Sequence, residues 1–471
     1  MKETREELLK KLPSVDNVLK DKQLDGNFTD IPRKIIVNAV RQAVETVRGL
    51  IVEEKLRDYE KKDIYEQIIS EAKTQINSFR RSHYAKVVNA TGIILHTGLG
   101  RAVLAKESLE QIQTELGGYC LLQLDIETGK RSKRDERIEW LLQQLTGAEA
   151  ATVVNNNAAA TAIVLNTVAK DKEVIVSRGQ LVEIGGSFRL PEVFAFSGVK
   201  LVEVGTTNRT HPKDYEKAIT ENTAAILRVH PSNYKIQGFA SEVELKKLVE
   251  IAHSHNLVMI DDVGSGALMD FTKFGFSAEP TLPESIQAGA DIVTSSADKL
   301  IGASQGGIII GKRHLIDAIR KNPFARIVRV GKFTLAALEA TLKLFLDESI
   351  AISKVPTLQM MLRGLGEIEK QAEKMVTQLS KEKLDAKIET TAGFSELGSG
   401  SLPTQQIASR LVSVQPKKMT TEQLAEKLRK YNPPIIARVA DEKVLIDPRT
   451  LRNEDDRIVT EALTAILHRG K

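Results

Sequence analysis

The sequence predicts an α/β fold with a mostly parallel sheet that helices cover on both faces. Short apolar runs alternate with amphipathic helical segments between about Val87 and Lys332. This alternation is typical of βα units, whose strands are buried on both faces and therefore read as nearly continuous apolar runs. We expect strands to begin at Ala150, Glu173, Lys200, Ala224, Leu257, Asp291 and Gly306.

The segments on either side of this sheet differ from it in composition. Residues 1–82 are charged and carry apolar residues at helical spacing. After Thr334 a helix-forming run leads to the strand-like stretches 433–439 and 443–448. We therefore expect a helical N-terminal domain over 1–82, a large catalytic domain over 83–335 and a small α+β C-terminal domain over 336–471.

The composition is that of an ordinary soluble globular protein, with 42% hydrophobic and 27% charged residues. The net charge of +5 permits a polyanionic partner, although a normal solvated surface explains it as well. The single cysteine, Cys120, excludes an intrachain disulfide and a thiol cluster for a metal. No apolar run reaches the roughly 18 residues of a membrane span, and the first residues lack the apolar stretch of a signal peptide. We expect a cytoplasmic protein with no membrane partner and no metal.

Three consecutive asparagines follow the first expected strand. The stretch "NNNAAAT" runs from Asn155 to Thr161 and opens an expected helix. The start of a helix offers free backbone N–H groups and the positive end of the helix dipole, which suit a bound phosphate. Capping of the helix by one asparagine explains the same residues. Phosphate binding and capping both stay open on this pattern.

Two charged residues end later strands of the same expected sheet. Asp262 closes an apolar run in "DDVGSGA", and Lys299 follows the next run. A buried carboxylate needs a cation or a strong donor, and an isolated lysine would serve as a salt-bridge partner. Ligands of open α/β sheets bind beyond the carboxyl ends of the strands, where these residues are expected to meet. A phosphate site, a carboxylate and an amine together indicate pyridoxal 5′-phosphate, whose phosphate, ring nitrogen and aldehyde they would hold.

Longer motifs follow one another along nearly the whole chain, from about Leu12 to about Arg452. They are "KKLPSVDNVL", "VVNATGIILHTGLGRAVLA", "LTGAEAATVVNNNAAAT", "SRGQLVEIGGSFRLPEV", "VGTTNRT", "HPSNYKIQGF", "DDVGSGAL", "ADKLIGASQGGIIIGK" and "RIVRVGKFTLAALEATL". In this order they resemble the bacterial selenocysteine synthase family, the L-seryl-tRNA(Sec) selenium transferases.

The resemblance implies a fold and a reaction. The fold would be that of a fold type I pyridoxal-phosphate-dependent transferase, similar to aspartate aminotransferase, assembled as a homo-oligomeric ring of dimers, a decamer. The N-terminal domain would bind tRNA(Sec) charged with serine. The enzyme would replace the β-hydroxyl of the seryl group by selenium from selenophosphate and release L-selenocysteinyl-tRNA(Sec) for selenoprotein synthesis.

The resemblance also implies roles for residues that match the motifs. Lys299 would form the Schiff base with the cofactor, and Asp262 would bind the pyridine nitrogen. Asn156 and Asn157 would take the phosphate. The residues expected near the ring are His230, Ser232 and Asn233. Those expected at the selenium donor are Arg101, Arg326 and Arg329, because guanidinium groups bind oxyanions bidentately. Asp298, beside the lysine, matches a further active-site position.

Arg438 occupies a place where fold type I enzymes often hold a substrate carboxylate, and its role here is open. Several other residues depart from the family pattern. The departures are Gly98, Leu121, Gln123, Leu124, Ser132, Gln180 and Ala297. Gln123 and Gln180 replace a carboxylate by an amide that carries no charge.

Two alternative functions follow from these departures. One is a related lyase or transferase acting on a small phosphorylated amino acid or amino-sugar acid, although such relatives generally lack the module over 1–82. The other is a tRNA-binding protein with a vestigial cofactor site, against which Lys299 and Asp262 argue.

Overall fold

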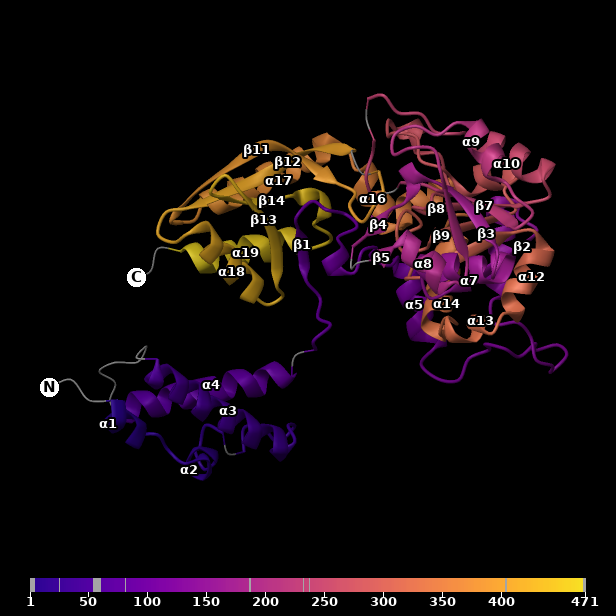
Figure 1. Ribbon diagram of the computed structural model, residues 1–471. Helices are drawn as coiled ribbons and strands as arrows, with labels where there is room; N and C mark the ends of the chain where they lie inside the picture. Colours follow the sequence, from indigo (N-terminus) through magenta and orange to yellow (C-terminus); the bar gives the residue numbers. More distant parts are fainter. Residues whose placement is uncertain are drawn as a thin grey trace. The chain divides into compact units, whose positions relative to one another are not determined.

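The chain divides into two units, residues 1–86 and 87–471 (Figure 1). The computed structural model describes residues 5–24, 26–53, 61–80, 82–185, 188–231, 233–236, 238–402 and 405–468. Within these ranges no helix is both long enough and apolar enough to cross a membrane.

The N-terminal unit is helical, as its sequence period predicts. Its helices are α1 (Arg5–Lys10), α2 (Val15–Leu19), α3 (Arg33–Val52) and α4 (Lys61–Arg80). Val40, Val44 and Val47 of α3 are buried in one core together with Ile68 and Ile76 of α4. Apolar residues three and four positions apart share a helix face, so this spacing gives each helix the apolar stripe along which the two pack.

A seven-stranded sheet forms the centre of the second unit, in the order β2-β10-β9-β8-β7-β3-β6. Its strands are β2 (Ala150–Val154), β3 (Glu173–Ser177), β6 (Lys200–Val204), β7 (Thr223–Val229), β8 (Val258–Gly264), β9 (Ile292–Ser296) and β10 (Gly307–Gly311). All pairs are parallel except those of β10 with β2 and β9, which are antiparallel. Each of the seven apolar runs that the sequence assigned to the mostly parallel sheet is a strand of this sheet.

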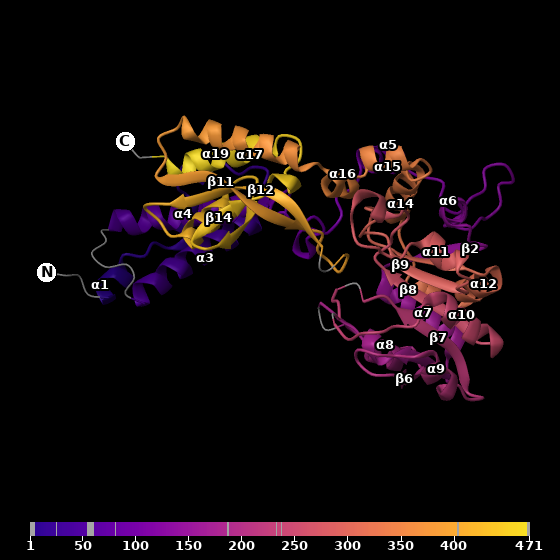
Figure 2. The ribbon, with the colours of Figure 1, turned by 90° about the horizontal axis from the view of Figure 1, so that it is seen from above.

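Helices cover both faces of the seven-stranded sheet (Figure 2). One face packs against α7 (Asn157–Ala169), α8 (Leu190–Phe196) and α12 (Arg313–Lys321). The other packs against α6 (Glu136–Thr146), α9 (Pro212–Ala218), α10 (Leu245–Ser254), α11 (Leu282–Gln287) and α14 (Lys332–Leu344). Coverage on both faces explains the apolar runs that make up most of these strands, whereas the edge strand β6 carries the exposed residues Lys200 and Glu203.

A second, five-stranded sheet lies in the C-terminal part, in the order β1-β13-β14-β12-β11. Its strands are β1 (Val88–Ala90), β11 (Ala386–Glu396), β12 (Gln406–Pro416), β13 (Ile435–Ala440) and β14 (Lys443–Ile446). Its core includes residues of α17 (Leu365–Ser380), α18 (Thr421–Lys430) and α19 (Asp455–Leu467). Strand β1 joins this sheet from the other end of the unit's sequence, in parallel with β13.

Short elements complete the second unit. They are α5 (Lys106–Glu115), α13 (Phe324–Ile327), α15 (Glu348–Lys354), α16 (Pro356–Leu362), the hairpin of β4 (Glu183–Ile184) and β5 (Phe188–Arg189), and the 3-10 turns η1 (Thr97–Leu99), η2 (Arg178–Gln180), η3 (Phe271–Phe274) and η4 (Pro448–Thr450). Helix α14 spans the domain boundary that the sequence predicts at 335/336, and its apolar side chains pack in the core of the seven-stranded sheet.

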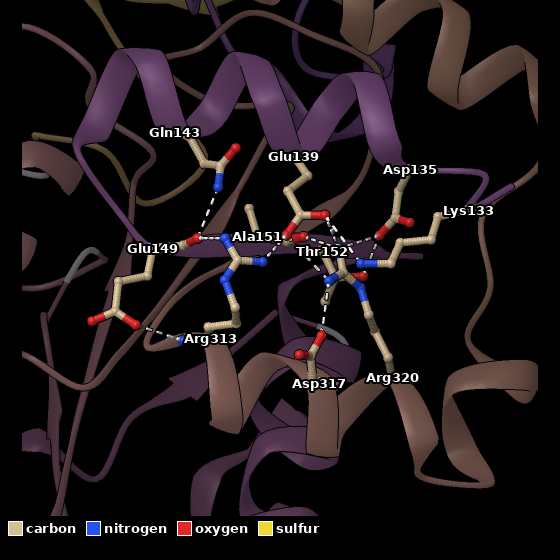
Figure 3. A network of polar contacts seen from close by, with 10 residues as sticks. All are labelled: Lys133, Asp135, Glu139, Gln143, Glu149, Ala151, Thr152, Arg313, Asp317 and Arg320. Atoms are coloured by element: carbon tan, nitrogen blue, oxygen red, sulfur yellow. Dashed lines mark hydrogen bonds and ion pairs between the residues drawn. The ribbon is translucent and has the colours of Figure 1, made fainter.

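A network of hydrogen bonds and ion pairs links the edge strand β2 to α6 and α12 (Figure 3). Arg320 of α12 donates to Glu139 of α6 at 2.8 Å and to the carbonyl oxygen of Ala151 at 2.5 Å. It also lies 3.5 Å from Asp135, whose carboxylate accepts a 2.6 Å hydrogen bond from Thr152. The side chains of Arg320 and Glu139 are only 15% and 9% exposed, so solvent screens this pair weakly.

Candidate active site

A cavity of about 220 Å³ lies at the carboxyl edge of the seven-stranded sheet. It is the place where a parallel α/β sheet is expected to bind its ligand. Residues that the sequence singled out line it together: Arg101, Asn156, Asn157, His230, Asp262, Asp298 and Lys299. Side chains from distant parts of the sequence therefore meet where strands β7, β8 and β9 end.

Lys299 is buried just beyond the end of β9, with 6% of the residue exposed. Its Nζ lies 3.4 Å from the carbonyl oxygen of Gly400, in the segment between β11 and β12. Burial lowers the pKa of Lys299, and the charge of Arg101 lowers it further, against the opposing effect of Asp262. A lysine whose ammonium form is disfavoured in this way is available as a neutral, nucleophilic amine.

Asp262 is the last carboxylate of β8 and faces the same cavity. Its Oδ1 accepts a 2.8 Å hydrogen bond from Asn157 Nδ2, and its Oδ2 accepts a 3.0 Å bond from Thr161 Oγ1. Burial raises the pKa of Asp262, while the hydrogen bonds from Asn157 and Thr161 lower it. A carboxylate so deeply buried is suited to a cationic partner such as a protonated ring nitrogen.

The first turn of α7 lines the cavity. Asn156 is the N-cap of α7, and its side chain accepts a hydrogen bond from the backbone N–H of Ala159 at 2.9 Å. The capping that explains one asparagine of this run is therefore present, and the first turn of the capped helix faces the cavity. Strand β10 passes close behind, because a Cβ at Gly307 would lie 2.1 Å from the carbonyl oxygen of Asn156.

Arg101 and Asp298 form an ion pair in the cavity wall. Arg101 Nη1 donates to Asp298 Oδ2 at 2.8 Å, and their side chains are 26% and 8% exposed. Arg101 follows the turn η1 with a positive φ of 60°. The pair keeps one guanidinium beside Lys299 while Asp298 is held in a fixed position.

Arg326 and Arg329 lie outside the wall of this cavity as the described residues define it. Both are exposed; Arg326 is on α13, and Arg329 forms an isolated β-bridge with Val154. They neighbour Arg134, whose pKa is lowered by burial and then by the positive charge of Arg329. The structure thus groups these two arginines with Arg134, whereas Arg101 lines the cavity.

The sequence predicts that His230, Ser232 and Asn233 lie together near the cofactor ring, but the structure separates His230 from Asn233. His230 lines the cavity, and its Nε2 lies 3.0 Å from Glu279 Oε2. Asn233 donates from Nδ2 to the carbonyl oxygen of Glu183 at 2.8 Å and lines a neighbouring cavity of about 330 Å³. Ser232 lies outside the described residues.

Some residues of the site were missed by sequence reasoning. Thr161 lies one helical turn after Asn157, so the two residues share a face of α7. This spacing is a sequence signal that could have identified Thr161. Glu279 is in a loop far from any motif, and no sequence signal marks it. Gly266, with φ of 78°, makes room for the carbonyl oxygen of Ser296, which a Cβ would approach to 2.3 Å.

Two of the residues that depart from the family pattern, and Arg438, whose role the sequence does not settle, form hydrogen bonds within the protein. Gln123 Oε1 accepts from Arg134 Nη2 at 3.0 Å, and Gln180 Oε1 accepts from the N–H of Val229 at 3.1 Å. Arg438 donates to the carbonyl oxygen of Phe394 at 3.0 Å and lies 3.4 Å from Asp447. An amide oxygen accepts such bonds as a carboxylate does, without the charge.

The residues of the cavity fit pyridoxal phosphate. Lys299 offers an amine, Asp262 a carboxylate for a protonated ring nitrogen, and the first turn of α7 the positive end of a helix dipole. Asn157 Oδ1 is buried and has no hydrogen-bond partner among the described residues, which leaves an acceptor free toward a ligand.

Comparisons of the sequence give consistent results along the whole chain. The family model of L-seryl-tRNA selenium transferase matches residues 87–452, and that of the selenocysteine synthase N terminal matches residues 9–48. The chain is 46% identical to the L-seryl-tRNA(Sec) selenium transferase of Alkaliphilus oremlandii (strain OhILAs) over 97% of this chain and 98% of that protein. It is 42% identical to the enzyme of the same name from Clostridium botulinum (strain Hall / ATCC 3502 / NCTC 13319 / Type A), over 98% and 99%.

Comparison of the structure identifies a related fold. D-glucosaminate-6-phosphate ammonia-lyase has a TM-score of 0.56 at 20% sequence identity, covering 81% of this chain and 95% of that one. This likeness, the mixed seven-stranded sheet and the separate α+β sheet confirm the fold class predicted from the sequence.

Proposed function

The chain belongs to the L-seryl-tRNA selenium transferase family, and we propose that it converts L-seryl-tRNA(Sec) to L-selenocysteinyl-tRNA(Sec). The cofactor is pyridoxal 5′-phosphate, and the selenium donor is selenophosphate. The family resemblance read from the sequence is confirmed, and with it the assignment of the chain as an enzyme. A charged tRNA as substrate also argues for a cytoplasmic location.

One observation carries the proposal beyond family membership. The amine of Lys299 and the carboxylate of Asp262 are both buried in one cavity at the carboxyl edge of the sheet. Burying an amine and a carboxylate costs free energy unless each group has a partner, from the protein or from a bound ligand. A site that must hold an aldehyde and a protonated ring nitrogen at the same time requires this pair.

Different residues of the cavity would carry out different steps of a β-replacement. When bound, pyridoxal phosphate carries the α-amino group of the substrate and accepts the electron pair left at the α-carbon. Lys299 would hold the cofactor and, as a neutral amine, would take the α-proton of the substrate. Asp262 would keep the ring nitrogen protonated, and Asn156 and Asn157 with the first turn of α7 would take the phosphate.

The selenium donor would be bound by arginines. Arg101 lies in the cavity wall beside Lys299 and carries a permanent charge for an oxyanion. Arg326 and Arg329 are proposed to act with it, because they match the same family positions. Their exposure and their grouping with Arg134 agree with a surface that receives a charged donor.

The helical unit over residues 1–86 is proposed to bind the tRNA. It has a core of its own, and part of it matches the family's N-terminal model. The proposed assembly is a ring of dimers, a decamer, which mass measurement in solution would test.

The deciding experiment is conversion of seryl-tRNA(Sec) with selenophosphate by the wild-type chain. Lys299→Ala should abolish conversion, whereas Lys247→Ala, an exposed lysine on α10, should keep the wild-type rate. A chain lacking residues 1–82 should lose conversion but retain bound cofactor, measured by its visible absorbance. Absence of conversion by a wild-type protein that binds the cofactor would redirect the search to small phosphorylated amino acids.

A further inference from the structure

His230 forms part of the wall between two cavities. On one side it lines the cavity of Lys299. On the other it lines a second cavity of about 230 Å³, whose wall also includes Tyr234, Lys235, Glu242, Ser277, Glu279 and Gln405. The imidazole therefore lies between the site of chemistry and a second cavity.

The backbone fixes His230 beside Asp262. Val229 and Asp262 are partners in the register of β7 and β8, and the N–H of His230 donates to the carbonyl oxygen of Asp262 at 2.9 Å. The side chain of His230 is 20% exposed. The ring is thus held at the same strand ends that carry the other groups of the site.

Glu279 holds the other side of the ring. Its Oε2 lies 3.0 Å from His230 Nε2, and its side chain is only 3% exposed. Its Oε1 is buried without a hydrogen-bond partner in the part of the chain that the structure describes. A buried carboxylate with one partner is a counter-ion for a charged group, and an imidazolium is the charged form of that partner.

The proposed reaction needs a proton donor that has not yet been named. Loss of the seryl β-hydroxyl as hydroxide is slow near neutral pH, so a positioned acid must protonate the oxygen as it leaves. Arg101 cannot give up a proton, and Asp298 is engaged with Arg101. Besides Lys299, which takes the α-proton, His230 is the group of this cavity with a ring nitrogen that can donate a proton.

Building on the proposed function, we infer that Glu279 is a positioning residue that holds His230 as the proton donor for the departing β-hydroxyl. The electron pair left at the α-carbon when Lys299 takes the α-proton forms a double bond to Cβ as the bond between Cβ and oxygen breaks. The electron pair of the broken bond stays on the oxygen, and the proton passes from His230 Nδ1 so that water leaves. Nε2 keeps its proton toward Glu279. The ring regains a proton from water through the second cavity.

Other charged groups also face this ring and bear on its charge. In the first cavity they are Arg101, Asp262, Asp298 and Lys299, and in the second they are Lys235, Glu242 and Glu279. Glu279 is the one among them that contacts the imidazole directly in the described structure. Removing its charge is therefore the most direct change to test.

The first test compares two leaving groups. Glu279→Gln should lower kcat for seryl-tRNA(Sec) about 100-fold, with KM little changed, because the acid is less available in the step that breaks the bond. The same variant should turn over a tRNA carrying β-chloroalanine at close to the wild-type rate, because chloride leaves without a proton. Glu279→Asp should recover part of the activity on serine.

A matched control lies five positions further along the same segment. Glu284→Gln makes the same change in charge, and glutamine keeps the capping box in which Glu284 accepts from Thr281. This control should behave as wild type with both substrates. His230→Gln should show the same selective loss of activity on serine as Glu279→Gln. Because two different variants are compared, a folding defect in one of them does not decide the test.

The second test needs neither cofactor nor tRNA. Exchange of the ring C–H of histidine with deuterium proceeds through the charged ring, and mass spectrometry resolves it for the peptide containing His230. In the apo-protein at one fixed pH, Glu279→Gln should slow this exchange, while Glu284→Gln should leave it unchanged.

The outcomes separate the inference from the proposed function. Equal losses on serine and β-chloroalanine in Glu279→Gln would overturn the inference and leave the ammonium of Lys299 as the acid. If the wild type fails to convert seryl-tRNA(Sec), the proposed function and the proton-donor role fall together. The exchange measurement then still decides whether Glu279 sets the charge of His230.

Discussion

Asn157 Nδ2 donates a 2.8 Å hydrogen bond to Asp262 Oδ1 and thereby ties the first turn of α7 to the end of β8. Thr161, one turn further along α7, donates to the other oxygen of the same carboxylate at 3.0 Å. Each oxygen of this buried group thus has a protein donor. The helix that is proposed to take the phosphate also orients the carboxylate proposed for the ring nitrogen.

Asp262→Asn should lower kcat by about 100-fold or more, because an amide cannot provide the charge that keeps a ring nitrogen protonated. The variant should also lose cofactor faster on dilution, which absorbance would follow. Asp261→Asn is its matched control, since Asp261 is the preceding residue of β8 and binds Ser285 and Arg228 instead. The control should unfold at a lower temperature yet keep kcat, and a large loss of kcat there would contradict the assignment.

Thr161→Val should weaken cofactor binding about 10-fold, which corresponds to loss of one hydrogen bond to a charged group, about 1.5 kcal/mol. Without this donor the pKa of Asp262 rises further, because Thr161 stabilises the charged form. Thr161→Ser keeps the hydroxyl and should bind the cofactor nearly as tightly as wild type. Equal affinities of the two variants, measured by equilibrium titration of the apo-protein, would show that the bond is dispensable.

Arg101→Gln should shift the pH dependence of cofactor uptake. The positive charge of Arg101 helps lower the pKa of Lys299, after the larger effect of burial. Removing that charge favours the ammonium form, so a higher pH is needed to obtain the neutral amine. The rate at which apo-protein takes up pyridoxal phosphate should then reach its half-maximum at a higher pH than in wild type. An unchanged midpoint would mean that Arg101 has no influence on Lys299.

Arg320→Leu should lower the free energy of unfolding by about 3 kcal/mol, because it strips Glu139 of a close cation in a poorly exposed site. Arg313→Leu removes an arginine from the same network (Figure 3). The side chain of Arg313 is, however, 52% exposed. That control should cost less than about 1 kcal/mol. Denaturant unfolding of the two variants measures the difference, and similar losses would disprove the role of burial.

The sequence was sufficient to predict the seven strands and the residues at their ends. Strands buried on both faces are mostly apolar, so polar residues such as Asp262, near the end of β8, and Lys299, just beyond β9, indicate the edge of the sheet that faces a ligand. Since parallel strands end at one edge, their convergence followed without coordinates. The partner of His230 could not be predicted, because Glu279 reaches it from an irregular loop that no period describes.

Other parts of the site depended on distances that no motif specifies. Gly264 lines the cavity, whereas Gly266 lies against the carbonyl oxygen of Ser296 at the end of β9. The motif treats both glycines alike. Arg101 and Arg329 also share one predicted role, yet only Arg101 contributes to the wall of the cavity that the described chain forms.

Strand β1 has a consequence for synthesis of the protein on the ribosome. Val88 pairs with Ile435, so the strand and its partner are 347 residues apart (435 − 88). At about 5–20 residues per second, the ribosome needs roughly 20–70 s to supply the partner. During that time β1 has emerged with no sheet to join, and the five-stranded sheet can be completed only when almost the entire chain has been translated. A nascent chain halted before Ile435 would therefore expose this segment to chaperones.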